Sequence, residues 1–369
     1  MTDAKKDYFP ALTGLRAVAA ALVYVHHYNP FSPARFGWRI HNLAAETHIG
    51  VTVFFVLSGF LIGYRYLGRR VALRTYFANR VARIYPMYLL LTTLVFALLH
   101  YREGLPFSLG EYLLNITFLR GLFEQYVYSG IAQGWSLTVE EMFYLSAPLA
   151  FGLLQRSRQW LWALPLALVM LGAGLVVLCR PLQWHGFFGS FDFLFQFTYL
   201  GRAIEFFVGV GLAWWLRRTG TAHAPRGLTS AGMVGMLFCL GVLSLLHGPT
   251  EGSFGVFTPA GMFINNVALP VLGIAPLLWG LVGEATWVRR LLSSRLLALL
   301  GRSSYVFYLI HVGAVRHLLY QWIGSSVLTA LSLWLVSILL YKMVEEPLNR
   351  WLRCVLQGSP ATAPVLMPQ

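Results

Sequence analysis

Charged residues are scarce in this chain of 369 residues. They make up 11% of it, against about 25% in ordinary soluble domains, whereas hydrophobic residues make up 57%. Acidic residues are the scarcest of the charged types, because 14 Asp and Glu stand against 28 Lys and Arg. So little charge among so many apolar residues excludes an ordinary soluble domain and is typical of a protein embedded in a lipid bilayer.

Cysteine, metal-ligand clusters and the common soluble catalytic motifs are absent or nearly so. The three cysteines are isolated, which excludes a disulfide framework, and no group of His, Cys and carboxylates has metal-ligand spacing. The sequence therefore predicts no metal and no permanently bound cofactor. It also has no Gly-x-Ser-x-Gly elbow, no phosphate-binding loop, and no His-x-x-x-Asp or His-x-x-x-x-Asp after its first histidines. None of its segments matches a soluble acyltransferase signature.

Long apolar runs, in contrast, fill the chain. A helix that crosses a bilayer needs about 20 largely apolar residues, and ten segments are predicted as such spans. These segments are 11–29, 48–66, 84–100, 135–155, 159–179, 199–216, 228–247, 263–283, 301–320 and 326–343. The predicted fold is an all-α membrane protein with about ten transmembrane helices, in one domain over residues 1–356. A short disordered cytoplasmic tail, 357–369, is expected to follow it.

The net charge of +14 would suit a nucleic-acid partner, but the distribution of the charge argues against one. Basic residues gather in every second loop, including Lys5 and Lys6 before the first span and residues 69–83 after the second, and are sparse in the loops between. This is the positive-inside pattern of multi-pass membrane proteins. It predicts that both termini face the cytoplasm, and that the lipid bilayer rather than nucleic acid surrounds the protein.

The first predicted span carries an arginine and two histidines. Arg16 and His27 are eleven residues apart, almost three helical turns, so they share one face about 16 Å apart along the axis, while His26 points about 80° away. Polar groups inside a span are costly and indicate a functional site, and a histidine accepts a proton from a hydroxyl near neutral pH. The alternative is that Arg16 reaches the headgroups and that the histidines lie at the outer interface.

Two further polar pairs flank later spans. Arg80 and Arg83 share a helix face before the third span, and guanidinium groups suit phosphate; alternatively they only flank the membrane. Glu140 and Glu141 begin the fourth span. One of these carboxylates can orient a histidine or act as an acid or base, unless the pair merely caps a loop.

Three more features are candidates for packing or function. Arg202 and Glu205 are three residues apart and are expected to form an ion pair within the membrane, chiefly a structural one. Gly209 and Gly211 are expected to allow close helix packing. His311 is either a second site residue or a hydrogen-bonded interior histidine.

The loops on the far side of the membrane from the termini hold many aromatic residues. They include Tyr126, Tyr128, Trp184, Phe187, Phe188, Phe191 and Phe193. Such residues either form an interfacial aromatic belt or line a cleft that binds an acceptor. Composition alone leaves both interpretations open.

In chain order, seven segments resemble the acyltransferase-3 family of multispanning membrane acyltransferases. They are LTGLRAVAA with its following histidine, GVTVFFVLSGFLI (50–62), NRVARIYP (79–86), WSLTVEEMFYL (135–145), GRAIEFFVG (201–209), SSYVFYLIH (303–311) and EEPLNRW (345–351). Together they cover about residues 10–351, nearly the whole chain. Each segment is weak evidence alone, but seven in the right order are specific. Some relatives carry a C-terminal esterase-like domain that is not seen here.

The resemblance implies both an activity and site residues. Family members O-acylate sugars, cell-surface polysaccharides, peptidoglycan or macrolides, with acyl-CoA as a cytoplasmic donor. The arginine and histidine that the family needs in its first span fall on Arg16 and His27. The basic pair thought to meet the CoA phosphates falls on Arg80 and Arg83, although Asn79 stands where the family often has a further arginine.

The sequence therefore predicts a membrane O-acyltransferase of the bacterial cytoplasmic (inner) membrane. It would move an acyl group, expected to be acetyl, from acyl-CoA as co-substrate to a hydroxyl of a sugar, a surface polysaccharide or a glycoside. His27 is the expected general base or acyl relay, Glu140 or Glu141 the group that orients it, and Arg16 a donor-binding residue with the basic pair. Further candidates are His26 as a catalytic residue and, as secondary ones, Arg202, Glu205, His311 and Ser58. The alternative is a proton-coupled transporter of a small polar substrate or glycoconjugate, which would use the same groups as a relay.

Overall fold

The computed structural model describes residues 8–69, 71–220, 225–248 and 252–357, and this part of the chain is helical. Within it, eight helices are long and apolar enough to cross a membrane, or nine if one bent pair counts as a span. The prediction of an all-α multispanning membrane protein is thus confirmed. Lys5, Lys6 and the predicted tail, apart from Gln357, lie outside the described residues.

The bundle is built from long helices, with shorter helices in the connections between them. The long ones are α1 (Pro10–His27), α4 (Ile49–Tyr66), α5 (Leu73–Glu103), α7 (Trp135–Arg156), α8 (Trp160–Cys179), α10 (Tyr199–Thr219), α11 (Leu228–Leu245), α15 (Arg295–Ile310), α16 (Ala314–Ile323), α17 (Ser326–Leu340) and α18 (Glu346–Gln357). Shorter helices are α2 (Pro33–Phe36), α3 (Trp38–Ala45), α6 (Leu109–Ile116), α9 (Phe191–Phe197), α12 (Pro259–Phe263), α13 (Ala275–Gly283) and α14 (Trp287–Leu292). A π-helical segment, η8 (Ile264–Ile274), joins α12 to α13. Such segments occur often at functional sites.

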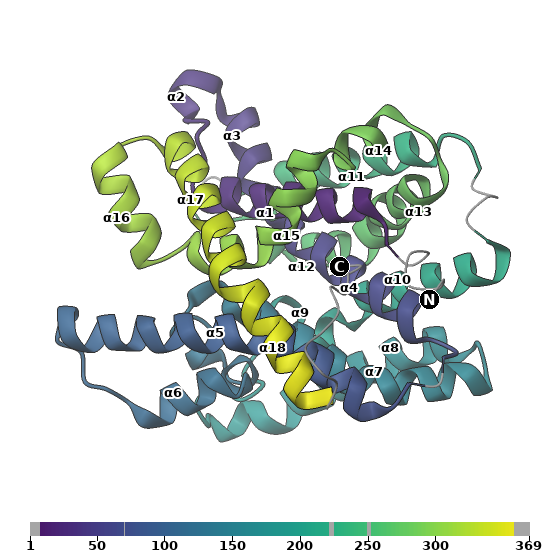
Figure 1. Ribbon diagram of the computed structural model, residues 1–369, viewed down its shortest axis with the longest axis horizontal. Helices are drawn as coiled ribbons and strands as arrows, with labels where there is room; N and C mark the ends of the chain where they lie inside the picture. Colours follow the sequence, from purple (N-terminus) through teal and green to yellow (C-terminus); the bar gives the residue numbers. More distant parts are fainter. Residues whose placement is uncertain (1–7, 70, 221–224, 249–251, 358–369) are drawn as a thin grey trace.

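The most apolar helix is not the most buried one. In the apolar stretch of the span that contains α4, 78% of the residues are buried, against 17% in the span that contains α8. Side chains of α8 such as Met170 and Leu178 are largely exposed, as expected where a helix faces lipid. α4 therefore lies at the centre, packed against α10 and α1, and α1 lies side by side with α15 (Figure 1).

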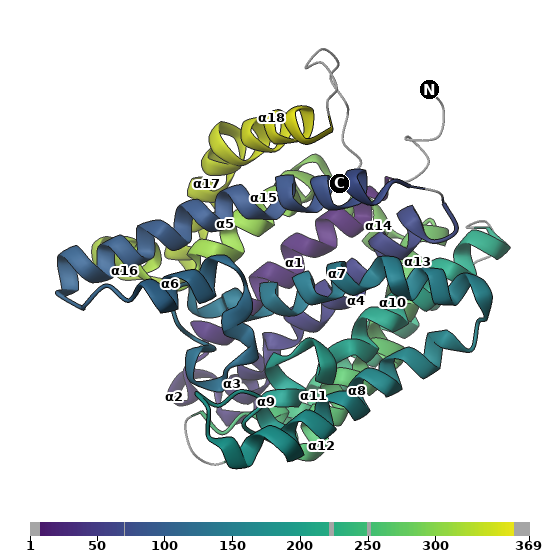
Figure 2. The same cartoon turned by 90° about the horizontal axis from the view of Figure 1, so that it is seen from below.

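Both ends of the described chain lie at one end of the bundle. Phe9 packs edge to face on Tyr64 near the end of α4, and the Gln357 amide donates to Asn79 Oδ1 near the start of α5. α18 lies along the outside of α5 (Figure 2). Arginines Arg65, Arg74, Arg217, Arg218 and Arg289 gather there, so we call it the basic end and the other the opposite end. That the basic end faces the cytoplasm stays a prediction.

The ninth predicted span, 301–320, was wrong as a single helix. α15 ends at Ile310 and α16 leaves at an angle of 96°. Gly313 has φ of 97°, a backbone conformation that residues with a Cβ rarely adopt, so the chain turns there instead of continuing the helix. The first predicted span does form α1, which is long enough to cross but less apolar than the others because it carries Arg16 and two histidines.

Glycines bring α4 and α10 into close contact, as the sequence suggested for Gly209. A Cβ added at Gly209 would lie 2.1 Å from the carbonyl oxygen of Val56, and one added at Gly59 would lie 2.0 Å from that of Phe206. Real atoms cannot approach so closely, so any larger residue forces the two helices apart. This contact aligns the α4 and α10 side chains that line the cavities described below.

We expect Gly59→Val to destabilise the protein by roughly 2 kcal/mol or more, because overpacking a tight contact shifts the backbone. Gly152→Val in α7 is the matched control, since Gly152 has open space around it. Thermal unfolding in detergent, followed by size-exclusion chromatography, measures the difference. Equal midpoints for the two variants would show that the α4–α10 contact tolerates expansion.

Candidate active site

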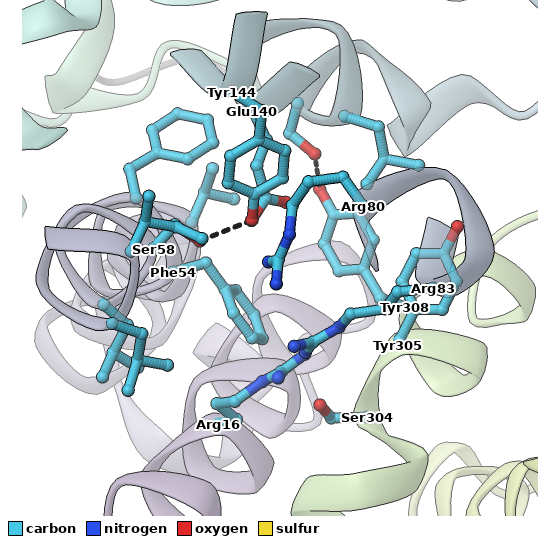
Figure 3. Close-up of a pocket in the computed structure, with 17 residues that line it drawn as sticks. Arg16, Phe54, Ser58, Arg80, Arg83, Glu140, Tyr144, Ser304, Tyr305 and Tyr308 are labelled. Carbon is cyan, nitrogen blue, oxygen red and sulfur yellow. Dashed lines mark hydrogen bonds between the residues drawn. The ribbon is translucent and has the colours of Figure 1, made fainter. Parts of the chain in front are cut away.

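Three arginines line a cavity of about 660 Å³ inside the bundle, toward the basic end. Arg16 comes from α1, and Arg80 and Arg83 come from one face of α5; their guanidinium groups converge in Figure 3. We call this the arginine cavity. Apolar side chains, including Phe54, form much of the rest of its lining.

Glu140 is the carboxylate in the lining of the arginine cavity. It accepts hydrogen bonds from the Ser58 hydroxyl of α4 and from the Tyr144 hydroxyl one turn further along α7 (Figure 3). Arg80 lies 5.4 Å from the centre of the Tyr144 ring, and its Nε is buried without a hydrogen-bond partner among the described residues. Three cations against one carboxylate leave the lining positive, which suits an anionic ligand.

A second cavity, of about 700 Å³, has histidines in its lining and lies toward the opposite end. His26 and His27 come from the end of α1, and His48 comes from the turn before α4. We call it the histidine cavity. Trp135, from the start of α7, also lines it, so the cavity combines aromatic surface with polar groups.

The hydrogen bond that His27 makes fixes its reactive nitrogen. Its Nδ1 lies 2.9 Å from the carbonyl oxygen of Val23, one turn back in α1. Because a carbonyl only accepts, Nδ1 carries the proton in the neutral ring and Nε2 keeps its lone pair. His27 is exposed to the cavity. It therefore presents what a general base or a nucleophile needs.

His27 lies between two other histidines that are held in the same way. Its ring centre is 5.0 Å from that of His26 and 5.1 Å from that of His311. His26 Nδ1 bonds to the carbonyl of Ala45, and His311 Nδ1 to that of Tyr308. His311 is fully buried and its Nε2 has no partner in the described residues. The exposed histidine of the three is the better placed to meet a substrate.

An amide and guanidinium network lies on another side of the histidine cavity. Arg202 pairs with the fully buried Glu205 at 2.7 Å, as the sequence predicted, and also donates to the Thr52 hydroxyl. Thr52 in turn donates to Asn265 Oδ1, and the Asn265 amide donates to Asn266. Both asparagines come from η8 and line the cavity. The ion pair thus orients amide groups in the site.

The two cavities share part of a wall. Val51 and Tyr308 appear in the lining of both. The Tyr308 hydroxyl is fixed by Ser136 at 2.7 Å and by the Gln133 carbonyl at 3.2 Å. Val51 and Tyr308 therefore lie between the arginine cavity and the histidine cavity.

A fully buried arginine in the connection before α7 shapes the histidine cavity from outside the spans. Arg120 donates to the carbonyls of Ser129 and Ile131, and burial lowers the pKa of its guanidinium, against the opposing effect of nearby tyrosines. These bonds fold the connection back so that Gln133 and Trp135 reach the cavity. Nothing in the sequence indicated this role for Arg120.

Several predicted contacts differ in the structure. Neither glutamate bonds to His27: Glu140 binds Ser58 on the arginine side, and Glu141 lines neither cavity and has a buried oxygen without a partner in the described chain. The backbone carbonyl of Val23 orients the histidine instead. Ser58 does lie in the arginine cavity, with the predicted arginines.

The aromatic loops divide between the two interpretations that the sequence left open. Tyr128 lines the histidine cavity, whereas Phe188 and Phe193 are buried in packing and Trp184 is 57% exposed. The sequence reasoning missed Asn265 and Asn266, although two adjacent amides in an apolar span are a signal of function. It also missed His48. No group of three or more His, Cys, Asp or Glu in the described residues is arranged to hold a metal ion.

The chain is similar to one family of known proteins over nearly its whole length. The family model of the acyltransferase domain matches residues 9–342. Acyltransferase MdmB of Streptomyces mycarofaciens is 28% identical over 93% of this chain and 92% of MdmB. O-acetyltransferase OatA of Staphylococcus aureus (strain NCTC 8325 / PS 47) is 23% identical over 93% of this chain, which spans 57% of OatA. No solved structure matches the chain.

The family match begins one residue before α1 and ends in the last span, so it includes every residue that lines the two cavities. The chain is an enzyme, an acyltransferase, and its helices make it a multi-pass membrane protein. It belongs to the acyltransferase-3 family.

Proposed function

We propose that the protein transfers an acetyl group from acetyl-CoA in the arginine cavity to a hydroxyl group in the histidine cavity. The carbonyl carbon breaks its bond to sulfur and forms a bond to the acceptor oxygen. The hydroxyl proton leaves, and the CoA thiolate takes up a proton, so the products are an ester and free CoA. The observation that carries the proposal is the wall of Val51 and Tyr308 that both cavities share.

The arginine cavity fits the donor. CoA is polyanionic, and Arg16, Arg80 and Arg83 offer guanidinium groups that bind phosphate in pairs of hydrogen bonds. In this proposal the thioester end of the donor enters the arginine cavity, and the nucleotide end lies toward the basic end. Glu140 is a positioning residue that holds the Ser58 hydroxyl at this site.

The histidine cavity fits an acceptor that carries hydroxyl groups, such as a sugar, a surface polysaccharide or a glycoside. Aromatic faces of Trp135 and Phe197 and the amides of Asn265 and Asn266 lie in its lining. Sites that bind small polar molecules combine such surfaces with a few directed polar groups. The O-acetyltransferase relative supports acetyl as the group transferred.

His27 is the catalytic residue of the proposed reaction. Its Nε2 either takes the proton from the acceptor hydroxyl or accepts the acetyl group and passes it on. Both routes use the tautomer that the Val23 carbonyl favours. The arginine-rich end faces the cytoplasm of the bacterial inner membrane in this proposal, in keeping with the positive-inside pattern.

The test uses inside-out membrane vesicles from cells that make the protein. Acetyl-CoA labelled with ¹⁴C in the acetyl group is added outside, where the cytoplasmic face is exposed. We expect label in the enclosed surface glycans or glycosides, identified by mass spectrometry, and free CoA outside in equal amount. Right-side-out vesicles with external acetyl-CoA should give no transfer. Transfer in that second preparation, or CoA-independent movement of a sugar, would contradict the proposal.

A further inference from the structure

A third cavity lies beside the histidine cavity at the opposite end. It has a volume of about 1390 Å³ and is lined by the outer end of α5, the bend between α15 and α16, and Tyr28 after α1. We call it the side cavity. The bend of 96° between α15 and α16 forms one of its walls.

The charged side chains that line the side cavity are all basic. Arg102 and Arg316 line it together with His317, and none of its lining residues is acidic. In the part of the chain that the structure describes, no carboxylate forms a salt bridge with either arginine. α16 also begins without a side-chain cap on its first backbone N–H groups. Among the described residues, the side cavity therefore offers donors for an anion and no carboxylate that pairs with them.

Aromatic rings hold Arg316 in place at the side cavity. Its guanidinium carbon lies 3.7 Å from the ring centre of Tyr28 and 4.2 Å from that of Tyr320. Ring contacts of this kind use the face of the guanidinium and leave the N–H groups at its edge. Its Nε is buried without a hydrogen-bond partner in the described residues. The Tyr24 hydroxyl accepts a hydrogen bond from this guanidinium, and a flat, fixed guanidinium whose remaining edge donors have no carboxylate partner among the described residues suits a phosphate.

The rest of the side cavity is apolar and lies where lipid is expected. Leu98, Leu99 and Leu309 are among its lining residues. Nearby, Tyr101 is 83% exposed and Trp322 is 89% exposed, as is typical of aromatic residues at a membrane interface. Cationic groups with an apolar wall beside them match a molecule that has an anionic head and a hydrocarbon tail.

We propose that the side cavity binds the phosphate headgroup of a membrane lipid, with Arg316 and Arg102 on the phosphate and the tail along α5. Two lipids share this chemistry: a bulk phospholipid such as phosphatidylglycerol, and a polyprenyl phosphate that carries a glycan. The inference goes beyond the proposed acetyl transfer and does not depend on it.

The side cavity lies next to the histidine cavity, where the acceptor is proposed to bind. The Gln133 amide lines the histidine cavity and donates to the carbonyl of Leu309, which lines the side cavity, at 2.7 Å. Tyr28 directly follows His27 in the chain. A group attached to the bound phosphate therefore lies next to the acceptor site. A lipid-linked glycan held here would present its sugar to His27.

The test measures lipid binding to the purified full-length protein in detergent by native mass spectrometry. Phosphatidylglycerol, polyprenyl phosphate and zwitterionic phosphatidylcholine are titrated separately. We expect at least one anionic lipid to bind more tightly than phosphatidylcholine. Arg316→Gln should weaken that binding about tenfold or more, because a hydrogen-bonded charge is lost. Arg102→Gln should weaken it as well, and Arg316→Lys should restore part of it.

Arg180→Gln is the matched control, since Arg180 is an exposed arginine at the same end, after α8, and outside the cavity. Stronger binding of polyprenyl phosphate identifies a lipid-linked ligand, and stronger binding of phosphatidylglycerol identifies a bulk lipid; either supports the site. Equal binding of all three lipids, or anionic binding that both arginine variants keep at wild-type strength, overturns it. Since no acetyl-CoA is present, failure here is distinct from failure of the acetyl-transfer test.

Discussion

Replacing His27 with Ala is expected to lower acetyl transfer by about 10³-fold while the protein stays folded in the membrane. The side chain is exposed to the histidine cavity, and among the described residues it hydrogen-bonds only to the Val23 carbonyl of its own helix, so its loss leaves no buried partner unsatisfied. The measurement is release of CoA and label in the acceptor under saturating acetyl-CoA. Yield after size-exclusion chromatography reports folding.

His100→Ala is the control for this result. His100 is exposed at the end of α5 and also bonds through Nδ1 to a backbone carbonyl, that of Leu105. It lies outside both cavities. Transfer that persists in His27→Ala but is lost in His311→Ala would move the chemistry to the buried histidine. Transfer that persists in both variants would show that neither His27 nor His311 takes part in the reaction.

The second large expected effect is a loss of affinity for the donor, acetyl-CoA, when Arg83 is replaced. Arg83→Ala should raise the KM for acetyl-CoA about ten- to a hundredfold with kcat changed much less, because it removes a charged hydrogen bond that the substrate and the transition state share. Steady-state kinetics over a range of acetyl-CoA concentrations separates the two constants. Added salt should weaken donor binding to the wild type more than to the variant.

Arg295→Ala is the matched control for Arg83→Ala. Arg295 is an exposed arginine that begins α15, and it does not line the arginine cavity. A drop in kcat with an unchanged KM in Arg83→Ala would place this arginine in the chemical step instead of donor binding. An equal rise in KM for both variants would show that donor binding responds to the overall positive charge and not to Arg83 in particular.

The sequence by itself determined that this is an all-α membrane protein, because a segment of about 20 apolar residues has few stable states other than a membrane helix. It also determined how side chains on a single helix lie relative to one another. Arg16 and His27 lie about three turns apart on α1 whatever surrounds them, and the structure places them in two different cavities. Arg202 and Glu205 pair for the same local reason.

Only the tertiary structure decided which side chains meet across helices. Glu140 lies on a different helix from both Ser58 and His27, and its position in the sequence does not tell which of them it bonds. The packing of α7 against α4 selects Ser58. The bend at Gly313 likewise depends on where α15 ends against its neighbours. The shared wall of Val51 and Tyr308 joins residues 257 positions apart. The periodicity of the sequence tells which residues share a helix face. Tertiary packing decides which helix that face contacts.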